Sequence, residues 1–237
     1  MKPIKKVIID KKENKYYWSK GDFHSLFGKI NENDIKSGRI KSHLGKEFIC
    51  FDASFVDNVM HMEKGPAIMT PKDIGYILSY CGINKDSKIV EAGAGSGVLT
   101  AFLGNISNNV FSYEKDENNL NIAKRNLESL GIKSNLKNKD IIEGVDEDNL
   151  DLIILDLPNP WDVLNQAKKS LKSDGFLVSY LPTIIQVKRL VDDAKALFYF
   201  DKAIELVERE WHVDGDKVRP KSKMIGHTGF IVIFRNL

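Results

Sequence analysis

A glycine-rich turn constrains the fold of this chain more than any other feature of its sequence. The segment Glu91-Ala-Gly-Ala-Gly-Ser-Gly97 follows a short β-prone run, Lys88 to Val90, and precedes an apolar segment, Val98 to Leu103, that is compatible with a helix. Glycines at alternate positions let backbone N–H groups approach a ligand closely at the start of a helix. The sequence therefore predicts a strand, a ligand-binding turn and a helix in succession.

The spacing of these glycines indicates which ligand the turn holds. The pattern is G-x-G-x-G, whereas dinucleotide-binding enzymes carry G-x-G-x-x-G. Glu91 stands two positions before the first glycine, Gly93, and offers a carboxylate to an ammonium group. This combination suits S-adenosylmethionine, which has an amino acid end and no phosphate. It disfavours a nicotinamide cofactor and thus an oxidoreductase.

Strand-like and helix-like segments alternate from residue 88 onward. Strands are predicted at 88–92, 109–114, 134–139, 151–157 and 175–181, and helices at 97–104, 116–130, 161–172 and 183–199. This alternation favours a doubly wound, mainly parallel sheet. A helix at 72–81 precedes the sheet, and two consecutive β-type runs, 203–212 and 228–235, close it. The predicted fold class is therefore α/β, a Rossmann-like class I methyltransferase fold.

The first part of the chain differs from the rest. Short β-prone runs separated by Gly, Asn, Asp and Ser predict a small β-rich N-terminal domain over residues 1–60, and residues 61–237 form the catalytic domain. Tyr16, Tyr17 and Trp18 stand among lysines, which suits contact with RNA. Because so small a domain has few other large apolar residues, these aromatic side chains are expected mainly in its core.

The charge is unevenly distributed although its formal net value is only +2. The first twenty residues hold seven lysines, from Lys2 to Lys20, against Asp10 and Glu13. A second basic cluster lies near the C-terminus and consists of Lys217, Arg219, Lys221 and Lys223. The two segments are either solvated faces or a footprint for the phosphates of a nucleic acid.

Composition excludes several classes of protein. A hydrophobic share of 42% and a charged share of 29% are ordinary for a globular protein. No apolar run approaches the roughly 20 residues of a membrane helix, and the N-terminus lacks the apolar stretch of a secretory signal. Cys50 and Cys81 form no C-x-x-C motif, and the five histidines show no ligand spacing. We therefore expect a cytoplasmic protein without membrane, metal or disulfide.

Acidic residues follow the second and third strands of the predicted sheet. In such folds ligands bind at the carboxyl ends of the strands. Glu114 lies seventeen residues after Gly97, where a carboxylate can accept both ribose hydroxyls of a nucleoside. Asp140 can accept from the amino group of an adenine, with Ile141 beside the ring. The alternative is a helix N-cap, for which Asp116 is also a candidate.

The fourth strand ends in Asp156-Leu-Pro-Asn-Pro-Trp161. A Pro-x-Pro sequence directly after a strand stiffens the chain and removes two N–H donors. Asp156 is thereby predicted beside the mouth of the site. The alternative is a strand-terminating turn with Trp161 starting a helix. The loop is loosely similar to the D-P-P-[YFW] turn of adenine amino methyltransferases, which presents hydrogen-bond acceptors to a base.

These motifs together resemble the tRNA (adenine-N1)-methyltransferase family of archaeal and bacterial type, which modifies T-loop adenines at positions 57 and 58. The matching segments are Glu91 to Thr100, Tyr113-Glu114, Asp156 to Trp161, Pro71-Lys-Asp73, Arg219-Pro220 and Met224-Ile-Gly-His-Thr-Gly-Phe230. The resemblance implies S-adenosylmethionine as cofactor, tRNA as partner, a small β N-terminal domain, a Rossmann-like catalytic domain and a homotetramer.

The resemblance also implies roles for individual residues. The methionine portion of the cofactor is expected at Glu91, Gly93, Gly95, Ser96, Gly97 and Val98, the ribose at Glu114, and the cofactor adenine at Asp140 and Ile141. Asp156 is the expected catalytic carboxylate and also borders the cofactor. Two features depart from the family pattern. Asn159 stands where an acidic residue is usual, and residues 64–70 lack the expected polar and aromatic side chains.

Methylation at adenine N1 sets particular chemical demands. N1 has a free lone pair and needs no deprotonation, but the product ring is cationic. Asp156, accepting from the exocyclic amino group, would stabilise that charge and the flipped adenine. N1 lies on the Watson–Crick edge, so the base must be flipped into a pocket. Trp161, Tyr180 and His227 are candidates to line it, although Tyr180 could belong to the core and His227 could bond the backbone.

Two other functions remain open from the sequence. One is an S-adenosylmethionine methyltransferase that acts on a small molecule or a protein. The other is a non-catalytic RNA-binding subunit, which would be expected to lose the glycine turn and the aspartate after strand four. Both features are intact here.

Overall fold

The computed structural model describes residues 3–65 and 68–237. Lys2 of the basic N-terminal segment, and Pro66 and Ala67 of the segment before Pro71, lie outside the described residues. The chain divides into two compact units, Met1–Glu63 and Lys64–Leu237. The division falls three residues after the boundary predicted at residue 60.

The first unit is built from short antiparallel strands. Its four-stranded sheet has the order β2-β1-β6-β5, and β3 and β4 form a separate hairpin. The elements are β1 (Lys6–Ile9), β2 (Lys15–Trp18), β3 (Phe23–Ser25), β4 (Gly28–Ile30), η1 (Glu32–Asp34), β5 (Gly38–Lys41), β6 (Glu47–Asp52) and α1 (Phe55–Met60). Tyr16 and Trp18 pack against the core, as expected, whereas Tyr17 is exposed and lies against His61 with ring centroids 3.6 Å apart.

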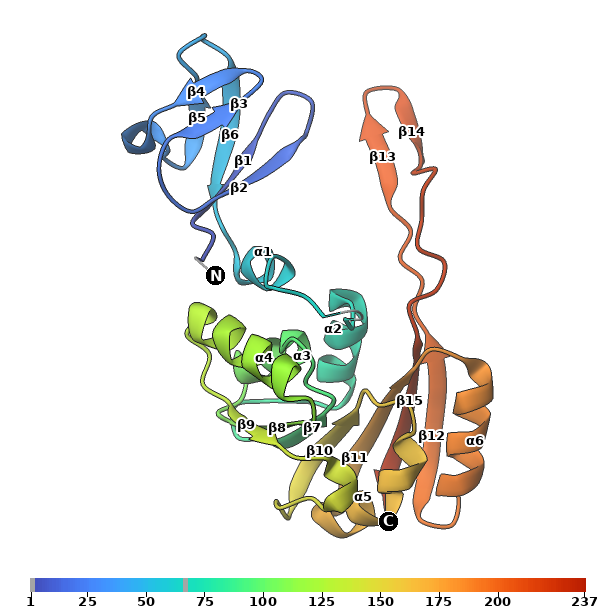
Figure 1. Ribbon diagram of the computed structural model, residues 1–237. Helices are drawn as coiled ribbons and strands as arrows, with labels where there is room; N and C mark the ends of the chain where they lie inside the picture. The colour runs from blue at the N-terminus through green and yellow to red at the C-terminus, as the bar shows by residue number, and fades with distance from the viewer. Residues whose placement is uncertain (1–2, 66–67) are drawn as a thin grey trace. The chain divides into compact units, whose positions relative to one another are not determined.

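The second unit is a seven-stranded sheet flanked by helices (Figure 1). Its strand order is β12-β15-β11-β10-β7-β8-β9, and β15 runs antiparallel to both of its neighbours. The strands are β7 (Lys88–Ala92), β8 (Asn109–Glu114), β9 (Asn135–Asn138), β10 (Leu150–Leu155), β11 (Leu171–Leu181), β12 (Phe198–Glu205) and β15 (Phe230–Asn236). The helices are α2 (Pro71–Tyr80), α3 (Val98–Gly104), α4 (Glu117–Leu130), α5 (Leu164–Ser170) and α6 (Ile184–Ala194), with short 3₁₀ turns η2 (Ile141–Glu143) and η3 (Pro160–Val163). The Rossmann-like fold predicted from the alternation is confirmed.

Burial explains why these segments form the centre of the sheet. In β10, every residue except Asp151 is buried, which is the pattern of a parallel strand covered on both faces. Helix α4 begins where the Asp116 side chain accepts a hydrogen bond from the backbone N–H of Asn119, and it ends at Gly131 in a left-handed conformation. The prediction of Asp116 as an N-cap is confirmed.

The C-terminal part differs from the prediction. The helix expected at 183–199 ends at Ala194, because Phe198–Glu205 forms the edge strand β12. The single run expected at 203–212 is wrong: β12 ends at Glu205, and a separate hairpin of β13 (Trp211–Asp214) and β14 (Lys217–Pro220) follows. Gly215, with a φ of 50°, makes its tight turn. The hairpin projects away from the seven-stranded sheet, beyond the ends of β12 and β15 (Figure 1).

Within residues 3–65 and 68–237, no helix combines the length and the apolar character needed to cross a bilayer. Nor do three His, Cys, Asp or Glu side chains come together there as metal ligands. Cys50 and Cys81 are both buried free thiols.

Candidate active site

A cavity of about 420 Å³ opens at the carboxyl ends of the parallel strands. Six of the residues predicted from the sequence line it: Gly93, Gly95, Glu114, Asp140, Ile141 and Asp156. They come from the ends of β7, β8, β9 and β10, so motifs that are separate in the sequence line one cavity in the fold. This is where ligands bind in open α/β sheets.

Each glycine of the turn has its own structural reason. Gly93, with a φ of 86°, passes so close to the next strand that an added Cβ would lie 2.2 Å from the carbonyl oxygen of Asp156. Gly95 has a φ of 55°, a left-handed conformation that favours glycine, and its N–H donates to the Glu114 carboxylate at 2.8 Å. Gly97 packs against helix α4, where a Cβ would lie 3.3 Å from Ala123. The turn thus binds two strands and a helix together while it faces the cavity.

Glu91 lies beneath the turn and is fully buried. Its Oε2 accepts from the hydroxyl of Thr100 at 2.7 Å and from that of Ser112 at 2.8 Å, whereas Oε1 has no partner among the described residues. Burial, and secondarily the charges of Asp156 and Glu114, raise the pKa of Glu91 to about 7. A carboxylate in this setting gains from a cation bound nearby.

Four predicted cofactor residues do not line the cavity: Glu91, Ser96, Gly97 and Val98. The side chains of Ser96 and Val98 are buried in the protein interior, and the Ser96 carbonyl accepts from Asn126 of α4. These residues shape the turn from behind. Their direct contact with a cofactor stays a prediction.

The acidic residues after β8 and β9 combine a local structural role with a place in the wall. Glu114 accepts from the N–H groups of Gly95 and Asp116, at 2.8 and 2.9 Å. Asp140 caps η2 by accepting from the N–H of Ile142 at 3.1 Å. The N-cap interpretation is therefore correct for Asp140, and it does not remove the residue from the cavity. Both side chains are held in place by hydrogen bonds within the protein.

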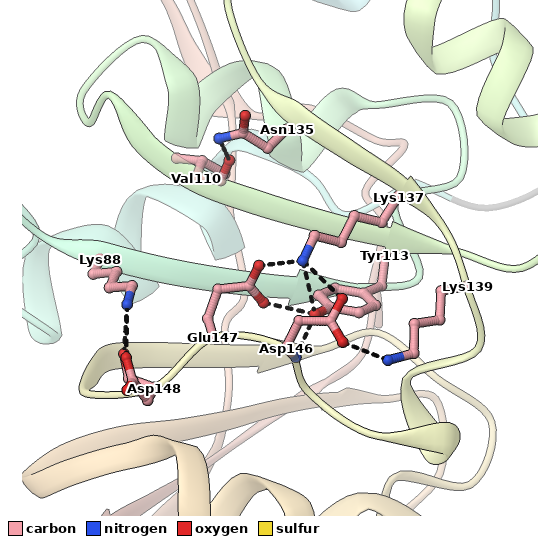
Figure 2. A network of polar contacts seen from close by, with 9 residues as sticks. All are labelled: Lys88, Val110, Tyr113, Asn135, Lys137, Lys139, Asp146, Glu147 and Asp148. Atoms are coloured by element: carbon pink, nitrogen blue, oxygen red, sulfur yellow. Dashed lines mark hydrogen bonds and ion pairs between the residues drawn. The ribbon is translucent and has the colours of Figure 1, made fainter.

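A polar network beneath the cavity was not predicted (Figure 2). The buried Tyr113 hydroxyl donates to Glu147 at 2.6 Å and accepts from the N–H of Asp146 at 2.9 Å. Lys137 contacts Glu147 and Asp146, and Lys139 donates to Asp146 at 2.6 Å. Burial and the bond to Glu147 raise the pKa of Tyr113 to about 12. The network fixes the loop that leads away from Asp140.

Other lining residues were also missed by sequence reasoning. They are Gly65, Ala92, Tyr113, Lys115, Asn119, Lys139, Ile142, Leu157, Pro158 and Asn159. Most of them adjoin a predicted residue in sequence, so a signal existed: residues on either side of a strand's last residue share its edge. Asn119 belongs to the first turn of α4 and had no such signal.

Asp156 presents a carboxylate at the cavity wall. Its N–H donates to the carbonyl of Ala92 at 2.9 Å, which locks β10 to β7 at the cavity. Its carboxylate accepts no hydrogen bond from the described residues, and burial raises its pKa to about 6. At pH 7 to 8 the side chain is thus mainly an unpaired carboxylate, half-buried at a cavity wall. It can accept from an amino group and stabilise positive charge.

The three predicted base contacts lie outside the lining of this cavity. Trp161 packs against the core, and the Arg189 guanidinium lies 3.8 Å from its ring centroid. The Tyr180 hydroxyl donates to Asp73 at 3.0 Å. His227 bonds Glu205 at 2.6 Å and donates to the Pro182 carbonyl at 2.9 Å, and the Glu205 contact raises its pKa. His227 therefore follows the alternative stated above, in which it bonds the backbone instead of lining the base pocket.

Comparison with known proteins gives the family. A family model described as tRNA methyltransferase complex GCD14 subunit matches residues 59–228. A Methanocaldococcus jannaschii protein, tRNA (adenine(57)-N(1)/adenine(58)-N(1))-methyltransferase TrmI, is 34% identical over 97% of this chain and 94% of its own. A Thermus thermophilus tRNA (adenine(58)-N(1))-methyltransferase TrmI is 32% identical over 91% of this chain and 89% of its own.

Solved structures agree on the fold. A Thermotoga maritima protein described as an S-adenosylmethionine-dependent O-methyltransferase superposes with a TM-score of 0.90 at 26% identity, covering 100% of this chain and 94% of the other. The Aquifex aeolicus tRNA (m1A58) methyltransferase TrmI gives 0.87 at 23% identity, covering 100% and 98%. The resemblance drawn from the motifs is confirmed, and the chain belongs to the family of the GCD14 subunit of the tRNA methyltransferase complex.

Proposed function

We propose that this protein transfers a methyl group from S-adenosylmethionine to N1 of a T-loop adenine in tRNA, at position 58, with position 57 as the second candidate target. The observation that carries the proposal is the carboxylate of Asp156 beside the glycine turn, which accepts no hydrogen bond from residues 3–65 and 68–237. Family membership supplies the class of reaction. The free acceptor supplies the chemistry that an adenine requires.

The cavity fits the cofactor in shape and charge. At Gly95, which lines the cavity, the nearest atom to an added Cβ is the Gly93 carbonyl oxygen at 3.9 Å, so a ligand can approach the backbone there. We assign the methionine portion to Gly93 and Gly95, the ribose to Glu114, and the adenine to Asp140 and Ile141. The cofactor is a cation, and the buried Glu91 carboxylate beneath the turn complements it. When bound, the cofactor supplies an electrophilic methyl group on its sulfonium.

Asp156 acts by position and charge rather than as a base. Adenine N1 attacks through its own lone pair, and positive charge spreads over the ring toward the exocyclic amino group. A carboxylate that accepts from this amino group orients N1 and becomes a stronger partner as the charge develops. Its half-buried setting makes the interaction stronger than it would be in water.

The decisive experiment maps the product in a tRNA transcript. The purified protein is incubated with transcript and S-adenosylmethionine, and the nucleosides are then located by digestion and mass spectrometry. We expect N1-methyladenosine in the T-loop. A transcript with guanosine at position 58 should lose the product there and show whether position 57 is modified independently. Methylation outside the T-loop, or of a small molecule or protein instead of tRNA, would contradict the proposal.

We further infer binding of RNA through the basic segments and assembly as a homotetramer. The uncovered apolar side chains of the β13–β14 hairpin support the assembly, because such residues favour burial against another chain. The lysines of the first unit, most of them exposed, support contact with phosphates. The cytoplasmic location stays a prediction.

A further inference from the structure

Asp73 is another buried carboxylate, and it has no role in the mechanism above. Asp73, in the first turn of α2, is fully buried. It accepts from the Thr70 hydroxyl at 2.7 Å, the Lys72 ammonium at 2.7 Å, the Thr228 hydroxyl at 2.9 Å and the Tyr180 hydroxyl at 3.0 Å. These five residues are called the Asp73 clamp below.

The Asp73 carboxylate at the centre of the clamp is ionised, and its oxygens accept four hydrogen bonds. Burial alone would raise the pKa of Asp73, but its four hydrogen bonds together hold that pKa below the ordinary value. The Lys72 ammonium also donates to Thr228 at 2.7 Å, so the positive charge bridges two members. Charge-assisted bonds of this kind are strong and directional. The segments that they join are therefore held in one arrangement.

The clamp unites parts of the chain that are distant in sequence. It joins the first turn of α2, the end of β11 and the segment directly before β15. Two motifs behind the family resemblance, Pro71-Lys-Asp73 and Gly226-His-Thr-Gly229, meet here. Gly229 is part of the fit, because a Cβ at that position would lie 2.5 Å from the Tyr180 ring. The Tyr180 side chain thus packs closely against Gly229, and its hydroxyl is held by Asp73.

Tyr180 is also the lateral neighbour of Asp156. Leu155 of β10 pairs with Ser179 of β11 in the parallel register, so the next residues of the two strands stand side by side. The negative charge of Asp156 contributes to raising the pKa of Tyr180, after burial and the proximity of Asp73. The clamp therefore ends on the residue adjacent to the proposed catalytic carboxylate.

We propose that Asp73 is a positioning residue for the acceptor base: it holds Tyr180 and the segment at Thr228 rigid beside Asp156. The proposal rests on the proposed function in that the base docks against Asp156. Asp73 itself touches neither base nor cofactor. The competing role is purely structural, in which Asp73 only fastens α2 to the sheet and contributes stability.

The test compares three variants in the full-length protein. Asp73→Asn removes the charge and leaves a single acceptor oxygen, and Tyr180→Phe removes one hydroxyl while the ring stays against Gly229. Asp151→Asn is the matched control, because Asp151 is also an aspartate bonded to a lysine and a backbone N–H, but at the opposite end of β10. Thermal midpoint, cofactor Kd and kcat are measured for each at a temperature where all are folded.

We expect Asp73→Asn to lower kcat on the order of 10- to 100-fold, because small misplacements near a reacting centre are costly. The cofactor Kd should not change. Tyr180→Phe should lower kcat as well, and the double variant should be no slower than Asp73→Asn, since both changes break the same contact. Asp151→Asn should lower the thermal midpoint and leave kcat unaltered.

Three results would overturn the proposal: an unchanged kcat in Asp73→Asn, an equal loss of kcat in Asp151→Asn, or losses that multiply in the double variant. Failure of the proposed function is separable from these results. If wild-type protein methylates another acceptor, the same kcat ratios are measured on that acceptor. The clamp is then tested whatever the identity of the substrate.

Discussion

At the scale of single residues, the site is defined by two carboxylates whose pKa values burial has raised. Glu91 has a pKa of about 7 and keeps two hydroxyl partners, whereas Asp156 has a pKa of about 6 and has no hydrogen-bond donor to its carboxylate in the described part of the chain. Such perturbed groups gather at functional sites because folding has not compensated their charge. A cationic cofactor and a base that becomes cationic provide the compensation that the protein lacks.

Asp156 is the first residue to test. We expect Asp156→Ala to lower kcat on the order of 100- to 1,000-fold, as when one preorganised group is lost, with a smaller effect on cofactor Kd. Asp156→Asn should retain part of the activity, because it keeps an acceptor without the charge. In the wild type, kcat/KM should fall as the pH drops through about 6, where the free carboxylate becomes protonated. That acid limb should be absent in Asp156→Asn.

Two measurements carry the prediction for Asp156: single-turnover methyl transfer and calorimetric cofactor binding. Equal losses of turnover and cofactor binding in Asp156→Ala would mean that the residue holds the cofactor and not the base. An acid limb that persists in Asp156→Asn would assign the titration to another group.

Glu91→Gln should make the cofactor-free protein less sensitive to pH. The folded-state pKa of Glu91, about 7, lies above its ordinary value of 4.5, so the native state binds this proton more tightly than the unfolded state does. Stability is therefore present at low pH and is lost as the pH rises from about 4.5 to about 7, on the order of 3 kcal/mol in all. The loss of thermal midpoint between pH 5 and pH 8 should be smaller in the variant.

Asp151→Asn serves as a control of opposite sign for Glu91. The bonds to Lys172 and Lys88 outweigh burial and hold the pKa of Asp151 below its ordinary value. Asp151→Asn should therefore not reduce the loss of stability that occurs as the pH rises. If Glu91→Gln leaves the pH profile of the thermal midpoint unchanged, Glu91 is ionised in the native state and the interpretation is wrong.

At the scale of elements, the sequence is most informative where one physical demand fixes the residue. The turn from Glu91 to Gly97 follows from backbone geometry, and β10 follows from its continuous apolar run. The β13–β14 hairpin was missed because the residues before it continue the β-prone pattern of β12, although Gly215-Asp216 between two β-prone runs is a local hairpin signal. The Asp73 clamp joins residues more than 100 positions apart, so its partners could only emerge from the tertiary fold.

The position of a site residue in the fold determines whether the sequence alone can identify it. Glu114, Asp140 and Asp156 each follow a predicted strand, and topology brings strand ends together. Tyr180 and His227 were chosen for their chemistry, and their partners, Asp73 and Glu205, lie on other elements. A side chain's hydrogen-bond partner is a tertiary property. Sequence can nominate such a residue, but it cannot say whether the protein already satisfies it.

Gly93→Ala tests the contact between the glycine turn and β10. A Cβ would lie 2.2 Å from the Asp156 carbonyl oxygen, and the φ of 86° disfavours any side chain. Gly131→Ala is the matched control: its φ is 68°, but open space surrounds the added Cβ. We expect Gly131→Ala to cost about 1 kcal/mol of unfolding free energy and Gly93→Ala clearly more, because overlap adds to strain. Cofactor binding should be lost only in Gly93→Ala.

Chemical denaturation and cofactor titration measure both glycine variants under one set of conditions. Equal destabilisation by the two changes would show that the Asp156 carbonyl can move away at little cost. The close approach of turn and strand would then not be a requirement of the site.

At the scale of the whole molecule, the β13–β14 hairpin is the feature that the second unit does not itself explain. Val213 pairs with Val218 and Trp211 pairs with Pro220, so these four side chains share one face of the two-stranded ribbon. Trp211, Val213 and Val218 are 53%, 73% and 60% exposed. An isolated two-stranded hairpin is marginally stable in water. An apolar face of this kind needs a cover.

A homotetramer would provide that cover, and the hairpin face is where it can be tested. If the proposed tetramer forms, we expect Val213→Lys to shift it to smaller species, because a charge in the middle of a buried apolar contact is left without a partner. His212→Lys is the control, since residue 212 alternates to the opposite face of β13, away from the apolar side chains. Sedimentation velocity of both variants at equal concentration separates the outcomes. A wild-type monomer, or a Val213→Lys variant that sediments like wild type, would show that the hairpin face is not part of an assembly. Its apolar face would then serve another partner. The tRNA is the first partner to test, by comparing its affinity for the two variants.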